Sequence, residues 1–440
     1  MAVPVAQRGA GTVPDTAART GHPAYVWCFT GSLLLSIFSG HSGDLGLPIG
    51  PDRMLFGLGC LLLLLDPVAW HASGRLRWRP VHTVMVAMLA LAAWSGAAHS
   101  TLLSSLGFFA FLDRLLVPFL LFCLAPLVYA TAPRRDLLLK SLTVLGLYLG
   151  VTAILEQVGP TRFVWPRYVV DEAVGINWGR ARGPFVASEA MGMALAQCGF
   201  AAAVLAARYR GAWRALAVVV MPLSVCGVFL CLTRSVWVGF TLGVVLACLA
   251  SPQLRRWLPL VLAGGAVALG VLVAAVPTLQ EVASERAGTT RSVDDRSNTN
   301  EAALRVVSEH PLTGVGWLRF IDVGSQYVRQ ADDYPVTNVT IEVHNVVLSR
   351  AAELGLPGAA LWVGCLLLGP ASAALRRRGR DEDAGQWKLL AIAGTTMWLF
   401  PEMLSPNPYP FPNFVVWTVA GIALRTHLLH PVGAPGGRRP

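Results

Sequence analysis

Long apolar stretches follow one another along most of the sequence and are separated by short polar segments. A helix needs about 20 mainly apolar residues to cross the hydrocarbon core of a membrane. Twelve stretches approach that length, at residues 23–40, 54–70, 81–98, 114–131, 137–157, 187–207, 213–232, 235–251, 257–276, 345–369, 388–403 and 411–427. The pattern predicts an all-α polytopic membrane protein with about twelve transmembrane helices.

The composition agrees with a chain whose solvent is mostly lipid. Hydrophobic residues make up 54% of the 440 residues and charged residues 14%, whereas a soluble domain has roughly a quarter charged residues. All eight cysteines fall within the predicted spans. The sequence therefore predicts neither a disulfide framework nor a metal site built on cysteine spacing.

The net charge of +10 follows largely from membrane orientation. Cations cluster in alternate short loops, and short cytoplasmic loops carry an excess of Lys and Arg. We expect both termini in the cytoplasm and two long external segments, so nucleic acid is not needed to explain the charge. The expected organisation is a cytoplasmic tail (1–22), spans 1–9 (23–276, with an external loop at 158–186), a large external loop (277–343), spans 10–12 (344–427) and a second cytoplasmic tail (428–440).

Arginine and aromatic residues alternate in the first external loop, from Arg162 to Tyr168 and from Asn177 to Phe185. The guanidinium group binds phosphate oxygens through paired hydrogen bonds, and aromatic rings suit sugar faces or the membrane interface. Ordinary interfacial anchoring is the alternative. Arg234 lies in the turn between spans 7 and 8, where an ionisable residue is a functional candidate unless it merely extends to the lipid headgroups.

The large external loop contains a helical pattern. Its apolar positions recur at Ala302, Ala303, Val306 and Val307, which predicts an amphipathic helix that ends at Pro311. The following sequence, Leu312-Thr-Gly-Val-Gly-Trp317, is typical of a tight turn whose backbone approaches another element closely.

His344 lies at the start of the tenth span and is followed by Asn345. The positive end of a helix dipole disfavours imidazolium, so we expect a neutral ring that can accept a proton. A His-Asn pair that caps the helix is the structural alternative. Glu353 lies three residues after Arg350, a spacing that predicts an ion pair and a structural role.

These external residues suit one kind of reaction. Arginines stabilise a pyrophosphate leaving group, while a neutral base takes the proton of an incoming hydroxyl. The chain resembles the O-antigen ligase and polymerase superfamily in four blocks: Arg182-Gly-Pro-Phe185, Leu232-Thr-Arg-Ser235, Arg296 with Ala303-Leu304 and His310-Pro-Leu-Thr-Gly-Val-Gly316, and His344-Asn345 through Glu353-Leu-Gly-Leu-Pro-Gly358.

The resemblance implies a GT-C-like enzyme of the bacterial plasma membrane that acts on the external face without a metal or other cofactor. It would transfer a glycan from a polyprenyl (undecaprenyl) pyrophosphate donor to an acceptor hydroxyl on a glycan or glycolipid, with inversion. The implied catalytic residues are His344, Arg234 and Arg296. Further substrate-binding candidates are Arg182, Gly183, Arg305, His310, Gly314, Gly316 and Asn345, with Glu353 and Gly355 as structural residues. The chain departs from the family at Asn300, where the family often has Trp.

Three alternatives stay open at this point. A protein O-oligosaccharyltransferase of the same superfamily would use a protein hydroxyl. A transporter or flippase of lipid-linked glycans would place paired charges near the bilayer midplane. A metal-dependent oligosaccharyltransferase would need external carboxylates, for which Asp44, Asp52, Asp332 and Asp333 are available.

Overall fold

The computed structural model describes residues 21–47, 49–67, 76–275, 291–329, 335–336, 342–376, 382–405 and 409–429. Within these residues the secondary structure is helical apart from an isolated antiparallel bridge between Leu76 and Leu429. Most of the two predicted tails and parts of the predicted loop 277–343, with Asp332 and Asp333, lie outside the described residues. The all-α prediction is confirmed.

The α-helices are α1 (Ala24–Leu35), α2 (Pro51–Leu64), α4 (Pro80–Ala98), α5 (Ser105–Phe111), α6 (Val117–Val128), α7 (Ala132–Gln157), α8 (Ser188–Arg208), α9 (Ala212–Leu230), α10 (Arg234–Ala250), α11 (Pro252–Arg255), α12 (Leu258–Ala275), α14 (Arg291–Glu309), α15 (Phe320–Val323), α16 (Val346–Leu366), α17 (Ser372–Leu375), α18 (Glu382–Glu402), α19 (Pro410–Ala423) and α20 (Arg425–Leu428). The 3-10 segments are η1 (Ser36–Phe38), η2 (Gly43–Leu45), η4 (Thr161–Phe163), η5 (Arg167–Val170), η6 (Gly183–Phe185) and η7 (Gly324–Tyr327). The π-helical turns are η3 (Leu112–Leu116), which joins α5 to α6, and η8 (Leu367–Ala371), which joins α16 to α17.

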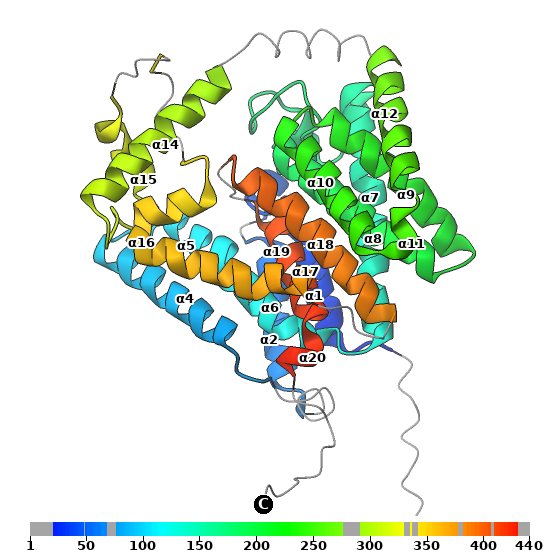
Figure 1. The fold of residues 1–440 in the computed structure, drawn as a ribbon, viewed down its shortest axis with the longest axis horizontal. Helices are drawn as coiled ribbons and strands as arrows, with labels where there is room; N and C mark the ends of the chain where they lie inside the picture. The colour runs from blue at the N-terminus through cyan, green and yellow to red at the C-terminus, as the bar shows by residue number, and fades with distance from the viewer. Residues whose placement is uncertain are drawn as a thin grey trace, which may run out of the picture.

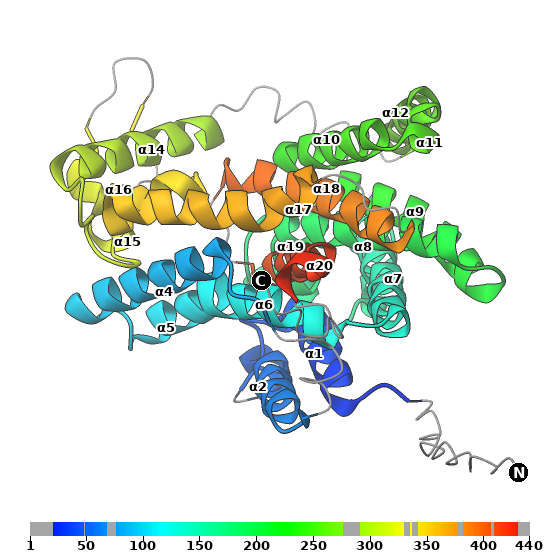
Figure 2. The ribbon, with the colours of Figure 1, turned by 60° about the horizontal axis from the view of Figure 1, so that its bottom comes forward.

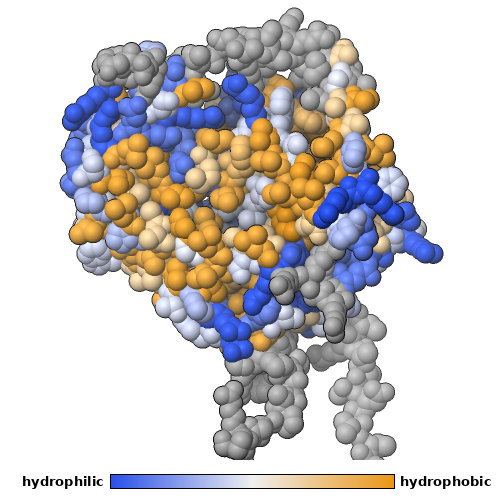
Figure 3. Space-filling view, in the orientation of Figure 1, coloured by the Kyte–Doolittle hydropathy of each residue, from blue (hydrophilic) through white to orange (hydrophobic). Residues whose placement is uncertain are grey.

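A helix lies at each position where the sequence predicted a span. Among the described residues, six helical stretches are long and apolar enough to cross a membrane: Pro80–Ala98, Ser105–Val128, Ala132–Gln157, Ser188–Arg208, Ala212–Leu230 and Val346–Leu375. Shorter apolar helices occupy Ala24–Phe38, Arg234–Ala250, Leu258–Val267 and Pro410–Ala423. The apolar surface crosses the middle of the molecule, with hydrophilic surface over α14 and along the opposite end (Figure 3). The total of twelve spans stays a prediction.

Helices α16 and α18 lie across the centre of the molecule (Figures 1 and 2). Helix α4 packs against α16, while α8 and α10 pack against α18, and α19 packs against α6. The centre is filled by fully buried aromatic side chains, including those of Trp387, Trp398 and Trp417. Helix α14 lies on α16 at one end of the molecule, which we call the α14 end.

The opposite end, which we call the Asp383 end, is stabilised by ion pairs. The Asp383 carboxylate forms ion pairs of 2.8, 2.6 and 2.7 Å with the guanidinium groups of Arg135, Arg208 and Arg425. These four residues come from loops or helix ends that the sequence assigned to one side of the membrane. They do lie at one end, and their orientation toward the cytoplasm stays a prediction.

Helix α14 confirms the amphipathic helix predicted in the large loop. Its Ala302, Ala303 and Val306 are buried in a separate small core with Val343 and Ala352. Because this core joins α14 to the start of α16, it holds the polar face of α14 beside the residues that precede α16.

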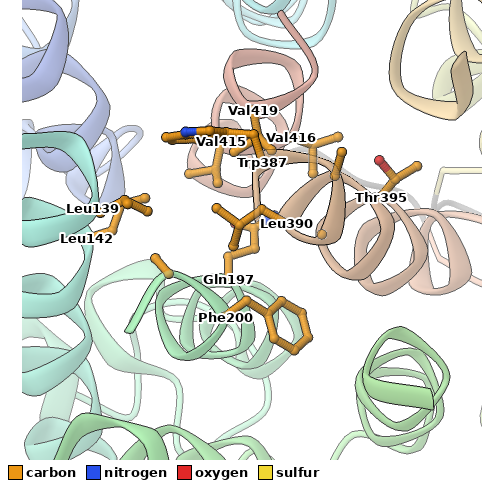
Figure 4. Close-up of a pocket in the computed structure, with 13 residues that line it drawn as sticks. Leu139, Leu142, Gln197, Phe200, Trp387, Leu390, Thr395, Val415, Val416 and Val419 are labelled. Atoms are coloured by element: carbon orange, nitrogen blue, oxygen red, sulfur yellow. The ribbon is translucent and has the colours of Figure 1, made fainter. Parts of the chain in front are cut away.

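A small cavity of about 20 Å³ lies between α7, α8, α18 and α19, lined by side chains such as Leu139, Phe200 and Trp387 (Figure 4). Its volume suits roughly one water molecule, and its lining is mainly apolar. It is a packing defect in the helix bundle and lies apart from the candidate site described next.

Candidate functional site

His344 lies directly before the first turn of α16, as the sequence predicted. Asn345 is the N-cap of this helix, and its Oδ1 accepts hydrogen bonds from the backbone N–H groups of Val347 (3.0 Å) and Leu348 (2.9 Å). The capping alternative is therefore confirmed for Asn345, whereas the His344 ring is left for other contacts. Its Nδ1 lies 3.5 Å from Thr299 Oγ1 on α14, which is long for a hydrogen bond.

The environment of His344 keeps its ring neutral. Burial lowers the pKa of His344 to about 4, with a further contribution from the nearby Arg296 guanidinium. A neutral imidazole has a nitrogen lone pair that can accept a proton. The sequence predicted a neutral ring from the helix dipole, and the structure adds burial and a neighbouring cation as causes.

Arg296 lies on the polar face of α14, near His344 and the carboxylate of Glu189. The guanidinium is within electrostatic range of both His344 and Glu189. Its Nε is buried and has no hydrogen-bond partner among the described residues, and no described carboxylate forms an ion pair with it. The group is therefore available to an anion.

Glu189 is the residue of this region that sequence reasoning missed. It lies in the first turn of α8, and its Oε1 accepts hydrogen bonds from Ser405 Oγ (2.6 Å) and Ser235 Oγ (3.5 Å). Arg296 and Arg180 lie within electrostatic range of it. An ionisable residue at the start of an apolar span was the available signal.

Glu189 therefore marks the point where four parts of the chain meet. They are the N-terminal ends of α8 and α10, the segment after α18 and the polar face of α14. Arg234 is the first residue of α10, directly before Ser235. The fold thus brings Arg296 and Ser235, the residue directly after Arg234, to the surroundings of one carboxylate.

Three arginines of α2, η3 and α10 differ in whether a described carboxylate neutralises them. Arg53 pairs with Asp113 at 2.7 Å, and Arg114 forms two bonds of 2.7 Å to Glu342. Arg234 is exposed and has no hydrogen bond or ion pair with any described residue. It also lies at the positive end of the α10 dipole, where an anion is favoured.

A second group of charges lies beneath His344. Glu342, two residues before it, receives the two bonds from Arg114, which lies on the π-helical turn η3. Arg350 pairs with Glu353 at 3.0 Å, which confirms the predicted ion pair. The buried Arg114 ties the segment that carries His344 to η3, whereas the Arg350–Glu353 pair lies within α16.

The two glycine motifs form one packed unit. Helix α16 is interrupted at Gly355, whose φ of 72° is favourable only for glycine. The backbone N–H groups of Val315 and Gly316 donate to the carbonyls of Ala352 (2.9 Å) and Glu353 (2.9 Å), and that of Leu356 donates to Pro311 (2.7 Å). The close approach predicted for the Gly314–Gly316 turn is confirmed, and the approached element is α16. This favours a structural role for Gly314 and Gly316 over substrate binding.

Arg182 and Gly183 organise the loop at 158–186. The buried Arg182 guanidinium donates to the backbone carbonyls of Val174, Val169 and Asp171 at 2.8–2.9 Å. The backbone N–H groups of Arg182 and Gly183 donate to the Glu156 carboxylate at 3.1 and 2.9 Å. The donors of Arg182 are thus engaged within the loop, which favours a loop-forming role over substrate binding.

Arg305 and His310 hold the segment after α15 against α14. Arg305 donates to the Tyr327 carbonyl at 2.9 Å and pairs with Glu301 at 3.0 Å. His310 Nε2 lies 3.2 Å from the Tyr327 hydroxyl.

Of the alternative metal ligands, Asp44 pairs with His41 at 2.9 Å, and Asp52 is buried at the start of α2.

Comparison with protein-family models matches residues 216–363 to the O-antigen ligase family. The matched segment runs from α9 into α16, so it contains Arg234, Arg296 and His344. The resemblance found in the sequence is confirmed for this segment. No curated protein matches the chain.

Proposed function

We propose that this chain, whose residues 216–363 match the O-antigen ligase family, is a membrane glycosyltransferase. It moves an oligosaccharide or polysaccharide from a polyprenyl pyrophosphate donor to an acceptor hydroxyl, with inversion and without a metal. The reaction takes place at the α14 end, on the external face of the membrane. The acceptor hydroxyl belongs to a glycan or glycolipid, and a protein hydroxyl is the alternative.

The observation that carries the proposal is the Arg296 cation near a neutral His344, together with the exposed Arg234 at the start of α10. Arg234 and Arg296 have no ion-pair partner among the described residues, whereas Arg53 and Arg114 do. A charge left without a partner at a protein–lipid boundary is costly, so such residues usually mark a function. A pyrophosphate would supply the missing negative charge and match the planar guanidinium groups.

These residues support a direct displacement. The acceptor oxygen attacks the anomeric carbon, and His344 takes the proton of the acceptor hydroxyl. The bond between the anomeric carbon and the pyrophosphate oxygen breaks as the new glycosidic bond forms. The electron pair leaves with the polyprenyl pyrophosphate, whose added negative charge Arg234 and Arg296 stabilise.

Donor binding would also improve His344 as a base. The Arg296 cation contributes to the low pKa of His344, and an anion bound to Arg296 offsets that effect. The pKa of His344 then rises from about 4 toward the range in which a general base is most effective.

The test is transfer by purified protein in vesicles, with lipid-linked oligosaccharide extracted from cells that carry the gene. Arg234→Ala and Arg296→Ala should each lower the rate by about 10²–10³-fold, and His344→Ala by about 10²–10⁴-fold. Arg162→Ala and His41→Ala are matched controls at exposed or loop positions, and they should retain the rate. Activity should persist in a chelator.

Three results would contradict the proposal. If the His344→Ala protein transfers glycan at the wild-type rate, His344 is not the general base. Loss of activity in the chelator would favour a metal-dependent enzyme. Movement of the lipid-linked glycan across the vesicle membrane without a new glycosidic bond would identify a transporter.

A further inference from the structure

Trp178 presents one face of its indole ring outward from the loop at 158–186. The Arg182 guanidinium lies 4.7 Å from the ring centroid, and Arg182 is buried. One face of the ring is therefore covered by a fixed side chain, yet 49% of Trp178 is exposed. The other face is open.

The turn that carries Trp178 is held in one conformation. The Ile176 N–H donates to the Val186 carbonyl at 3.0 Å. Asn177 and Val186 both adopt positive φ, at 61° and 49°. This conformation is unfavourable for a β-branched residue such as Val186, and retained strain of this kind clusters at functional sites.

Polar contacts of Ser188 join this turn to Thr233. Ser188 Oγ donates to Asn177 Oδ1 at 3.1 Å, and the hydroxyls of Ser188 and Thr233 lie 3.0 Å apart. Asn177 directly precedes Trp178, and Thr233 directly precedes Arg234. The turn that carries Trp178 is thus linked, through the buried Ser188, to the residue directly before Arg234.

The surroundings of Trp178 differ from those of a membrane anchor. The exposed carboxylates of Asp171 and Glu172 lie within electrostatic range of Arg182 beneath the ring, and they would be repelled by anionic lipid headgroups. Elsewhere in the same loop, Phe163 and Trp165 are 64% and 57% exposed. Arginines flank those two residues, which is the composition expected at the headgroup layer.

We propose that the open face of Trp178 binds a sugar ring of the donor glycan whose pyrophosphate lies at Arg234. The apolar C–H face of a pyranose packs on an aromatic ring in the way that other apolar groups do. The inference rests on the proposed function, and it adds a sugar-binding subsite that selects donors by their glycan.

The test compares two ligands of the purified protein in nanodiscs: undecaprenyl pyrophosphate without sugar, and the extracted lipid-linked oligosaccharide. The wild type should bind the second ligand more tightly. Trp178→Ala should weaken binding of the oligosaccharide lipid by about 2- to 10-fold and leave the sugar-free lipid unchanged. Trp178→Phe should retain most of the affinity. Trp165→Ala, the matched control from the same loop, should change neither.

Equal wild-type affinity for the two ligands would overturn the subsite. The same conclusion would follow if Trp178→Ala weakened both ligands equally, because the loop would then have lost its structure. A protein that shows the expected binding difference but forms no glycosidic bond would overturn the transferase proposal and leave the sugar subsite supported. The two failures are therefore distinguishable.

Discussion

At the scale of single residues, His344 and Arg296 are coupled by charge. Arg296→Gln should raise the pKa of His344 above about 4, because a nearby cation disfavours imidazolium, while burial still keeps the pKa below about 6.5. The measurement is an NMR titration of histidine-labelled protein, with the His344 signal assigned by its absence in His344→Gln. A titration curve unchanged by Arg296→Gln would contradict the coupling.

The same pKa sets the pH dependence of transfer. The ring is neutral above its pKa, so kcat/KM should stay level through neutral pH and fall only as the pH decreases through about 4. The acid limb of kcat should lie at higher pH, because the bound pyrophosphate offsets the Arg296 charge. A kcat/KM limb at or above about 6.5, the ordinary histidine value, would contradict the assignment of His344 as the base.

The hydrogen bonds of Arg182 predict that its replacement lowers the stability of the protein. Arg182→Lys retains the charge but cannot reach three carbonyls with one ammonium group in the same geometry. We expect a loss of roughly 3 kcal/mol in the free energy of unfolding, since hydrogen bonds of a buried charged group are lost. Thermal unfolding in detergent measures it, and Arg162→Lys in the same loop is the control. Equal melting temperatures for the two variants would refute the loop-forming role.

At the scale of elements, the interruption of α16 depends on two glycines. A Cβ on Gly355 would lie 2.4 Å from the Leu312 backbone, and one on Gly314 would lie 2.4 Å from the Glu353 backbone. Gly355→Ala and Gly314→Ala should each destabilise the protein by about 1–3 kcal/mol from backbone strain alone, with a further cost from these contacts. Gly394→Ala is the matched control, because a Cβ there meets nothing within 4 Å. If all three variants unfold at the same temperature, the packing of the Gly314 turn against the interruption of α16 contributes nothing to the stability of the protein.

The sequence predicted most elements and part of the site, and the difference has a physical reason. Local periodicity and helix-start signals determine the positions of the spans, of α14 and of His344. A short stretch of sequence contains these patterns. The role of Glu189 depends on Ser405, 216 residues away, and that of Glu342 on Arg114, 228 residues away. Contacts at such separations follow from the path of the whole chain, which no local pattern contains.

Arg182 illustrates the same limit. Its residue type and motif are equally suited to binding phosphate and to binding backbone carbonyls. Only the path of the loop around Val169, Asp171 and Val174 distinguishes the two roles.

At the scale of the whole molecule, Asp383 joins helices from both halves of the chain. Asp383→Asn would remove the ion pairs that this carboxylate makes with Arg135 and Arg425, whereas Arg208 would retain Asp136 at 2.7 Å. We expect a loss of about 3 kcal/mol in the free energy of unfolding, because a partly buried carboxylate with three ion pairs is removed. Glu382→Gln, at the exposed neighbouring position, is the control for a thermal unfolding measurement. An equal effect of both substitutions would show that surface charge alone is responsible.

The close packing of the turn at Gly314 against the interruption of α16 at Gly355 has a consequence for how such proteins diversify. Each glycine makes room for the backbone of the other segment, so neither segment fits a partner of different shape. A chimera that takes only the loop from one protein and the helix from another would combine surfaces that were never matched. The turn at Gly314 and helix α16 must therefore be inherited, exchanged and engineered together, even though 40 residues of sequence separate the two glycines.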